Sequence, residues 1–230
     1  SQLEVASPVF RHTHEARERM RALREGVAEV AASFGYRLVS AGTHPLSAWQ
    51  AQAATSGTRY AKLMEDFQII GRRNVLCGLH VHCGVPADTD RVQLMNRLMP
   101  WLPFLLALSA SSPFWGGQPT GLSSYRQAAY DEWPRTGIPD EFDDQAAYDR
   151  FVAQLVAQGA IRDGSFLWWA IRPSLAFPTL ELRICDAGTR VDDALAIAAL
   201  FRCLVRLHLR QPARGGERSP GRRRLIDENR

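Results

Sequence analysis

Apolar residues spaced three and four positions apart indicate a chain rich in amphipathic helices. A helix over about 14–34 has one apolar face, formed by Met20, Leu23, Val27, Val30 and Phe34. The same kind of spacing predicts further helices over about 59–71, 89–107, 144–158 and 192–209. The segment 109–121 is rich in Ser, Pro and Gly, which is typical of a long loop.

Alternation of polar and apolar residues predicts short strands between these helices. Segment 74–85 is the most informative, because its apolar face alternates with one that carries two histidines between two glycines. This second face consists of Asn74, Leu76, Gly78, His80, His82 and Gly84. Glycine in a strand leaves space for a close approach, so we expect this face to hold a ligand. The other predicted strands cover 2–5, 36–41, 165–171 and 179–186, the last two joined by a link whose prolines lie outside the ladder.

Three of the predicted strands carry a polar pair two residues apart: Gln2/Glu4, His80/His82 and Glu181/Arg183. Each pair projects from one face, so a single sheet could gather carboxylates, imidazoles and a guanidinium over a shared cavity. This set suits a divalent cation and a phosphate. Plainer interpretations stay open, namely an exposed strand face for Gln2/Glu4 and an ordinary ion pair for Glu181/Arg183.

Composition narrows the classes of protein that fit. With 46% hydrophobic and 23% charged residues among 230, the chain is typical of a globular protein. Four cysteines are too few for a disulfide scaffold, so we expect a reducing, cytoplasmic setting. Pro100 and Pro103 interrupt the apolar run before residue 108, which favours a buried helix over a membrane span. Zinc is disfavoured because Cys77 and Cys83 lie on the apolar strand face.

The net charge of +4 belongs to the end of the chain, where seven arginines lie between residues 210 and 230. We therefore predict one domain over 1–209 and a mobile, Arg-rich segment over 210–230. A neutral body does not favour nucleic-acid binding. The sequence contains neither a Walker-type phosphate loop nor a Gly-x-Ser-x-Gly element.

Five motifs in order carry a family resemblance. They are Gln2-Leu-Glu-Val-Ala-Ser-Pro8, Gly78-Leu-His-Val-His-Cys-Gly84, Ser112-Pro-Phe-Trp115, Thr120-Gly-Leu-Ser-Ser-Tyr-Arg126 and Thr179-Leu-Glu-Leu-Arg-Ile-Cys-Asp186. With them the chain resembles the bacterial carboxylate-amine ligase family, often labelled glutamate-cysteine ligase type 2 and related in fold to glutamine synthetase. The family's Glu-rich first strand and its C-terminal portion have no counterpart here, so we expect a partial member, incomplete at its N-terminus.

The resemblance implies an α+β fold in which an antiparallel sheet forms a funnel, with helices packed on its other face. The funnel would hold ATP, Mg²⁺ or Mn²⁺ and an amino-acid substrate. Family members transfer the γ-phosphoryl group to a carboxylate, and an amine then displaces phosphate to leave an amide, such as a γ-glutamyl amide. A loop such as 109–121 would exclude water from the intermediate.

The motif positions imply a role for each site residue. The metal ligands would be Glu4, His80 and Glu181. The catalytic residues would be Arg183, which faces the phosphate, and Arg172, which supports it. Further nucleotide-site residues would be Gln2, Asn74 and His82, and substrate-binding residues would be Arg59, Tyr60, Tyr125 and Arg126. Two other functions stay open. One is a metal-dependent hydrolase at the His80/His82 strand, and the other an inactive ligase-like scaffold that binds through its Arg-rich tail. A homo-oligomer also stays open.

Overall fold

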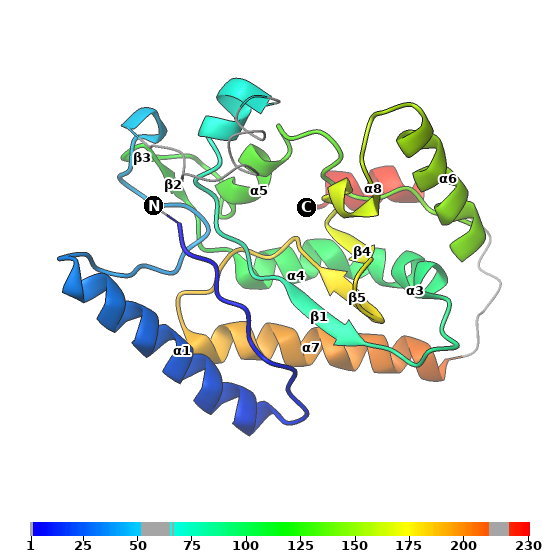
Figure 1. The fold of residues 1–230 in the computed structure, drawn as a ribbon, viewed down its shortest axis with the longest axis horizontal. Helices are drawn as coiled ribbons and strands as arrows, with labels where there is room; N and C mark the ends of the chain where they lie inside the picture. The colour runs from blue at the N-terminus through cyan, green and yellow to red at the C-terminus, as the bar shows by residue number, and fades with distance from the viewer. Residues whose placement is uncertain (1, 52–64, 66, 212–220) are drawn as a thin grey trace. The chain divides into compact units, whose positions relative to one another are not determined.

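The computed structural model describes residues 2–51, 65, 67–211 and 221–230. Helices are combined with small antiparallel sheets, so the predicted α+β class is confirmed (Figure 1). The chain folds as two compact units. Unit 1 comprises residues 1–78, 109–132 and 186–199, and unit 2 comprises residues 79–108, 133–185 and 200–230. The funnel and the boundary at residue 209 stay predictions.

Unit 1 begins with an irregular segment followed by the long helix α1 (Thr13–Ser33), which was predicted. The strands predicted at 2–5 and 36–41 are wrong, because residues 2–10 and 36–40 have no regular secondary structure. A strand is stable only beside a partner, and within the described residues neither segment is paired in a sheet. Their apolar side chains are accordingly exposed: Leu3 is 65% and Tyr36 is 72% accessible.

The predicted loop 109–121 contains a small hairpin of β2 (Phe114–Trp115) and β3 (Gln118–Pro119). Gly116 and Gly117 form its turn with φ values of 57° and 82°, a conformation that glycine adopts without a steric cost. Helix α5 (Tyr125–Tyr130) follows the hairpin, and the single-turn helix η1 (Trp49–Ala51) lies earlier in the unit.

A fully buried carboxylate, Asp186, holds the start of α5. Its Oδ2 accepts hydrogen bonds from the Ser111 amide at 2.9 Å and the Ser112 hydroxyl at 2.6 Å. Its Oδ1 accepts one from the Ser124 hydroxyl at 2.9 Å. Ser112 Oγ in turn accepts from the Arg126 amide at 3.0 Å, so the first turn of α5 is anchored through Asp186.

Gly42 packs against this carboxylate, and we expect Gly42→Ala to lower the free energy of unfolding by about 1–3 kcal/mol. A Cβ atom there would lie 2.6 Å from Asp186 Cγ and 2.9 Å from Ser112 Cβ. Gly84→Ala is the matched control, because a Cβ at Gly84 meets nothing within 4 Å. Urea unfolding of both variants measures the difference, and equal stabilities would contradict the packing described.

Unit 2 is built on an antiparallel sheet with the strand order β1 (Val81–Gly84), β5 (Thr179–Leu182) and β4 (Ile171–Pro173). Leu180, Leu182 and Ile171 are fully buried on its apolar side. Helix α3 (Arg91–Leu98) packs against β4 and β5. Its N-cap Asp90 accepts hydrogen bonds from the amides of the first turn, which fixes where the helix begins.

This sheet differs from the sequence prediction in several details. β1 and β5 are shorter than the strands predicted at 74–85 and 179–186, and two further differences concern β4. The strand predicted at 165–171 is wrong, because the single-turn helix η3 (Gly164–Phe166) begins there and β4 starts only at Ile171. The Asp163 side chain accepts a hydrogen bond from the Ser165 amide at 2.8 Å. This bond favours a helical turn rather than a strand at this position. Pro173 lies inside the ladder, opposite Leu180, and is tolerated because β4 is an edge strand.

The remaining helices follow the predicted periodicity. The helix predicted at 89–107 forms as α3, the short helix η2 (Met99–Trp101) and α4 (Leu102–Ser109), with Pro100 at the junction. Helices α6 (Gln145–Ala157) and α7 (Val191–Arg210) are confirmed. Residues 67–72 are helical, and the rest of the helix predicted at 59–71 lies outside the described residues except for residue 65.

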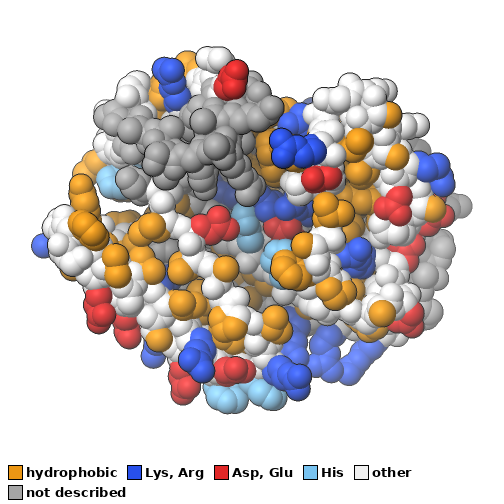
Figure 2. Space-filling model, viewed as in Figure 1, with side chains coloured by type: hydrophobic (Ala, Val, Ile, Leu, Met, Phe, Trp, Pro, Cys, Tyr) orange, Lys and Arg blue, Asp and Glu red, His pale blue; other side chains and the backbone are white. Residues whose placement is uncertain are grey.

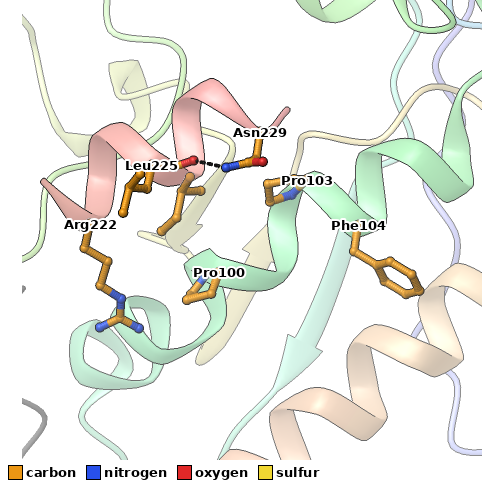
Figure 3. Close-up of a pocket in the computed structure, with 7 residues that line it drawn as sticks. Pro100, Pro103, Phe104, Arg222, Leu225 and Asn229 are labelled. Atoms are coloured by element: carbon orange, nitrogen blue, oxygen red, sulfur yellow. Dashed lines mark hydrogen bonds between the residues drawn. The ribbon is translucent and has the colours of Figure 1, made fainter.

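Helix α8 (Arg222–Glu228) lies within the Arg-rich segment. Ile226 is 7% exposed, and Arg222 forms an ion pair with Glu141 at 3.2 Å. A groove of about 510 Å³ is lined by apolar residues of η2, α4 and α8 together with Arg222 and Asn229 (Figure 3). It contains none of the predicted site residues. No helix in the described part of the chain combines the length and apolar character needed to cross a bilayer.

Candidate active site

The polar face of the unit 2 sheet brings together the two pairs predicted on its strands. Glu181 in β5 lies opposite His82 in β1 and opposite Arg172 in β4, so the three form a row across the sheet. Arg183 and His80 lie beside this row, with Arg183 Nη1 3.4 Å from His80 Nδ1. Two distant parts of the sequence, β1 and the neighbouring strands β4 and β5, therefore contribute to a single cluster.

Glu181 is the centre of this polar cluster. Its Oε2 accepts from Arg172 Nε at 2.7 Å, and its Oε1 accepts from Arg183 Nη1. Its side chain is only 4% exposed, and both imidazoles lie within 4 Å, at 3.9 Å for His80 and 3.8 Å for His82. Burial alone would raise the pKa of Glu181, but the charges and hydrogen bonds of Arg183 and Arg172 lower it to about 2.

Arg172 links the sheet to the chain that precedes it. Besides Glu181, it donates through Nη1 to the carbonyl oxygens of Ser165 at 2.8 Å and Leu167 at 2.6 Å. Among the described residues its hydrogen bonds use Nε and Nη1 only. Two guanidinium groups share one carboxylate, so the cluster keeps a net positive charge and favours an anion.

The imidazoles form the accessible edge of the cluster. Their side chains are 32% exposed for His80 and 40% for His82, and Figure 2 shows histidine surface beside basic side chains near the middle of the view. His82 Nδ1 lies 2.9 Å from Thr179 Oγ1, which orients the ring. The space above Gly84 is open, as the sequence predicted.

The described residues do not fit a Mg²⁺ or Mn²⁺ site. Among them, no three His, Cys, Asp or Glu side chains converge as a metal site requires. Both oxygens of Glu181 are engaged by arginines, and Mg²⁺ binds chiefly through oxygen ligands. The metal roles inferred for Glu4, His80 and Glu181 therefore stay predictions, and no chemical step is derived through a metal.

The N-terminal site candidates lie in unit 1. Gln2 Nε2 donates to the Leu76 carbonyl at 2.7 Å, so its side chain contacts the segment before β1. Glu4 is exposed, and Asn74 is half-buried at the end of a helical turn. Because these three residues belong to unit 1 and Glu181 belongs to unit 2, their joining in one site stays a prediction.

The structure describes two of the four predicted substrate-binding residues. Tyr125 and Arg126 begin α5, but Arg126 is only 2% exposed and its guanidinium lies 5.1 Å over the Tyr130 ring. Tyr125 packs beside Trp115 with ring centroids 5.4 Å apart. Arg59 and Tyr60 lie outside the described residues.

Sequence reasoning missed two features that shape these sites. The carbonyls of Ser165 and Leu167 hold Arg172, but backbone groups leave no signal in a residue pattern. Asp186 anchors α5, and its signal was available, because an acidic residue directly follows the buried Ile184 and Cys185. Cys185 is fully buried, and its Sγ contacts the Leu105 carbonyl at 3.7 Å.

Comparison with known proteins places the cluster in a family. A relative from Ectopseudomonas mendocina is 53% identical over 205 residues, covering 89% of this chain and 54% of the relative. Relatives from Bradyrhizobium diazoefficiens and Pseudomonas fluorescens are 49% and 47% identical, covering 92% and 100% of this chain and 50% and 59% of their own lengths. All three are named "Putative glutamate--cysteine ligase 2".

The chain thus spans about half the length of the curated relatives it matches. The model of the glutamate-cysteine ligase family 2 matches residues 1–228, which include every strand of the polar cluster. The chain therefore belongs to glutamate-cysteine ligase family 2.

Proposed function

We propose that the protein is an ATP-dependent carboxylate-amine ligase that forms an amide through an acyl phosphate. The observation that supports this most strongly is the pair Arg172 and Arg183 held on one buried carboxylate in a member of a ligase family. Guanidinium groups fixed by Glu181 need no reorganisation when an anion arrives, which is the arrangement that stabilises developing charge most effectively.

The arginines address the main obstacle to this reaction. A carboxylate and the γ-phosphoryl group of ATP are both anionic, so they repel each other until positive charge is placed between them. Arg183 lies beside His80 at the exposed edge of the cluster, and we assign it the transferred phosphoryl oxygens. Arg172 has most of its donors committed to Glu181 and two carbonyls, so its role is to position and to add charge.

The chemistry that follows needs no side-chain nucleophile. A carboxylate oxygen of the acid attacks the γ-phosphorus, the bond to ADP breaks, and an amine then attacks the acyl carbon and expels phosphate. The names of the relatives suggest glutamate as the acid and cysteine as the amine. Tyr125 and Arg126 remain our candidates for the acid's own carboxylate, and the loop 109–121 remains our candidate for excluding water.

The test is ADP release from the protein expressed from its complete reading frame. Mg²⁺-ATP is supplied with glutamate or another amino acid, paired with cysteine or another amine, and the amide is identified by mass spectrometry. The proposal predicts ADP release that requires both the acid and the amine. ATP-independent turnover, or ADP release that is the same without either partner, would contradict it.

The described part of the Arg-rich segment 210–230 gives little support to the alternative function, an inactive ligase-like scaffold that binds through this segment. Arg223 pairs with Asp140 at 3.2 Å, Arg230 pairs with Asp227 at 2.6 Å, and Arg224 pairs with Glu228. Arginines already paired with carboxylates present a weaker surface for phosphates.

A further inference from the structure

A row of aromatic side chains lies next to the arginine cluster in unit 2. Leu167 and Trp169 are buried at 1% and 7% exposure, while Phe166 and Trp168, which alternate with them along the chain, are half-buried. The same segment supplies the carbonyls that hold Arg172, so it is tied directly to the cluster. Trp168 precedes Arg172 by four residues, and their Cα atoms are therefore at most about 14 Å apart.

Arg135 stacks on Trp168 from a separate loop. Its guanidinium carbon lies 5.3 Å from the centroid of the indole ring, within the range of a cation–π contact. Two hydrogen bonds fix the pair: the Trp168 amide donates to the Arg135 carbonyl at 2.9 Å, and Arg135 Nε donates to the Phe166 carbonyl at 3.2 Å. Trp133 supports the indole edge-on at 5.7 Å.

Arg135 has a backbone φ of 60°, a left-handed conformation that non-glycine residues rarely adopt. Such a conformation costs free energy and persists only where its surroundings enforce it, which occurs most often at ligand sites. Here it places a guanidinium on a half-buried indole.

We propose that Trp168 and Arg135 form a stacking platform for the purine base of ATP. This inference rests on the proposed function, because the phosphates of the same nucleotide would meet Arg172 and Arg183. An indole ring and a guanidinium plane both bind the face of a nucleobase. An extended triphosphate can bridge a separation of the order set by the four-residue step from Trp168 to Arg172.

The test compares ATP with inorganic tripolyphosphate, which has the phosphates but no base. Dissociation constants are measured by titration calorimetry for the protein expressed from its complete reading frame and for Trp168→Ala. The platform predicts that Trp168→Ala weakens ATP binding about tenfold and leaves tripolyphosphate binding within about twofold. Trp168→Phe, which keeps an aromatic face, is expected to restore ATP binding to within about threefold. Trp168→Phe also allows the comparison to be made if Trp168→Ala does not fold.

The matched control is Trp101→Ala, which removes an exposed tryptophan of unit 2, on η2, and is expected to change neither constant. Unchanged ATP binding in Trp168→Ala would overturn the platform, and so would an equal loss for both ligands, which indicates a structural effect. If the unaltered protein binds tripolyphosphate as tightly as ATP, the platform fails while the phosphate site stands. If the unaltered protein binds neither ligand, both the platform and the proposed function are refuted.

Discussion

Replacing Glu181 by glutamine is expected to lower the free energy of unfolding by about 3–5 kcal/mol at pH 7. The change leaves the guanidinium groups of Arg172 and Arg183, only 14% and 11% exposed, without the carboxylate that compensates them. Removing one partner of a buried ion pair is costly because the other charges stay buried. Chemical denaturation at pH 7 measures the loss.

The matched control is Asp192→Asn. Asp192 also accepts from two arginines, Arg17 at 2.9 Å and Arg21 at 3.2 Å, but their side chains are 53% and 54% exposed. Solvent screens such a pair, so the expected loss is below about 1 kcal/mol. Equal losses in the two variants would show that burial of the Glu181 cluster contributes nothing extra.

Low pH is expected to lower the free energy of unfolding through protonation of Glu181. The pKa of Glu181 is lowered from 4.5 to about 2, so its contribution is fully present above about pH 5 and is lost as pH falls through about 2. A shift of this size corresponds to about 3 kcal/mol. The stability difference between the unaltered protein and Glu181→Gln should therefore narrow between about pH 5 and pH 2. A constant difference over that range would contradict the assignment.

The second large effect is on turnover. Arg183→Ala is expected to lower acid- and amine-dependent ADP formation by about 100-fold or more, because it removes a preorganised donor from the developing phosphoryl charge. Arg183→Lys keeps the charge but loses the planar fork, so a smaller loss of about tenfold is expected. The protein should stay folded, since Glu181 keeps its bond to Arg172.

Arg224→Ala is the control for Arg183. Its side chain is 75% exposed and pairs within α8 to Glu228, so removing it tests the loss of an arginine without touching the sheet. We expect unchanged ADP formation in this variant. Full activity in Arg183→Ala, or an equal loss in Arg224→Ala, would refute the role given to Arg183.

The helices and the centre of the cluster could be predicted from periodicity. α1, α6 and α7 were found because their apolar residues recur at helical spacing. The period-two pattern placed His80 with His82 and Glu181 with Arg183, and cross-strand pairing then joined both pairs in one sheet. These features depend on local geometry, which a sequence records directly.

What could not be predicted depends on a partner strand, on a single competing side chain or on strand register. Residues 36–40 alternate like a strand but have no neighbour to pair with in the described chain, and alternation alone does not supply one. Residues 164–166 turned into a helix because a single Asp163 side chain competes with the sheet. The two arginines on Glu181 were found separately, but their shared carboxylate emerges only from the register of β4 on β5.

Oxygen transfer tests the central claim, amide formation through an acyl phosphate, most directly. With the acid and amine pair that supports turnover, the acid is labelled with ¹⁸O in its reacting carboxylate, and the released inorganic phosphate is analysed by mass spectrometry. The carboxylate oxygen attacks phosphorus and stays with it when the amine displaces phosphate, so one ¹⁸O per turnover is expected in the phosphate. Phosphate without ¹⁸O, in which the fourth oxygen comes from unlabelled solvent, would show hydrolysis of ATP instead and would contradict the ligase mechanism.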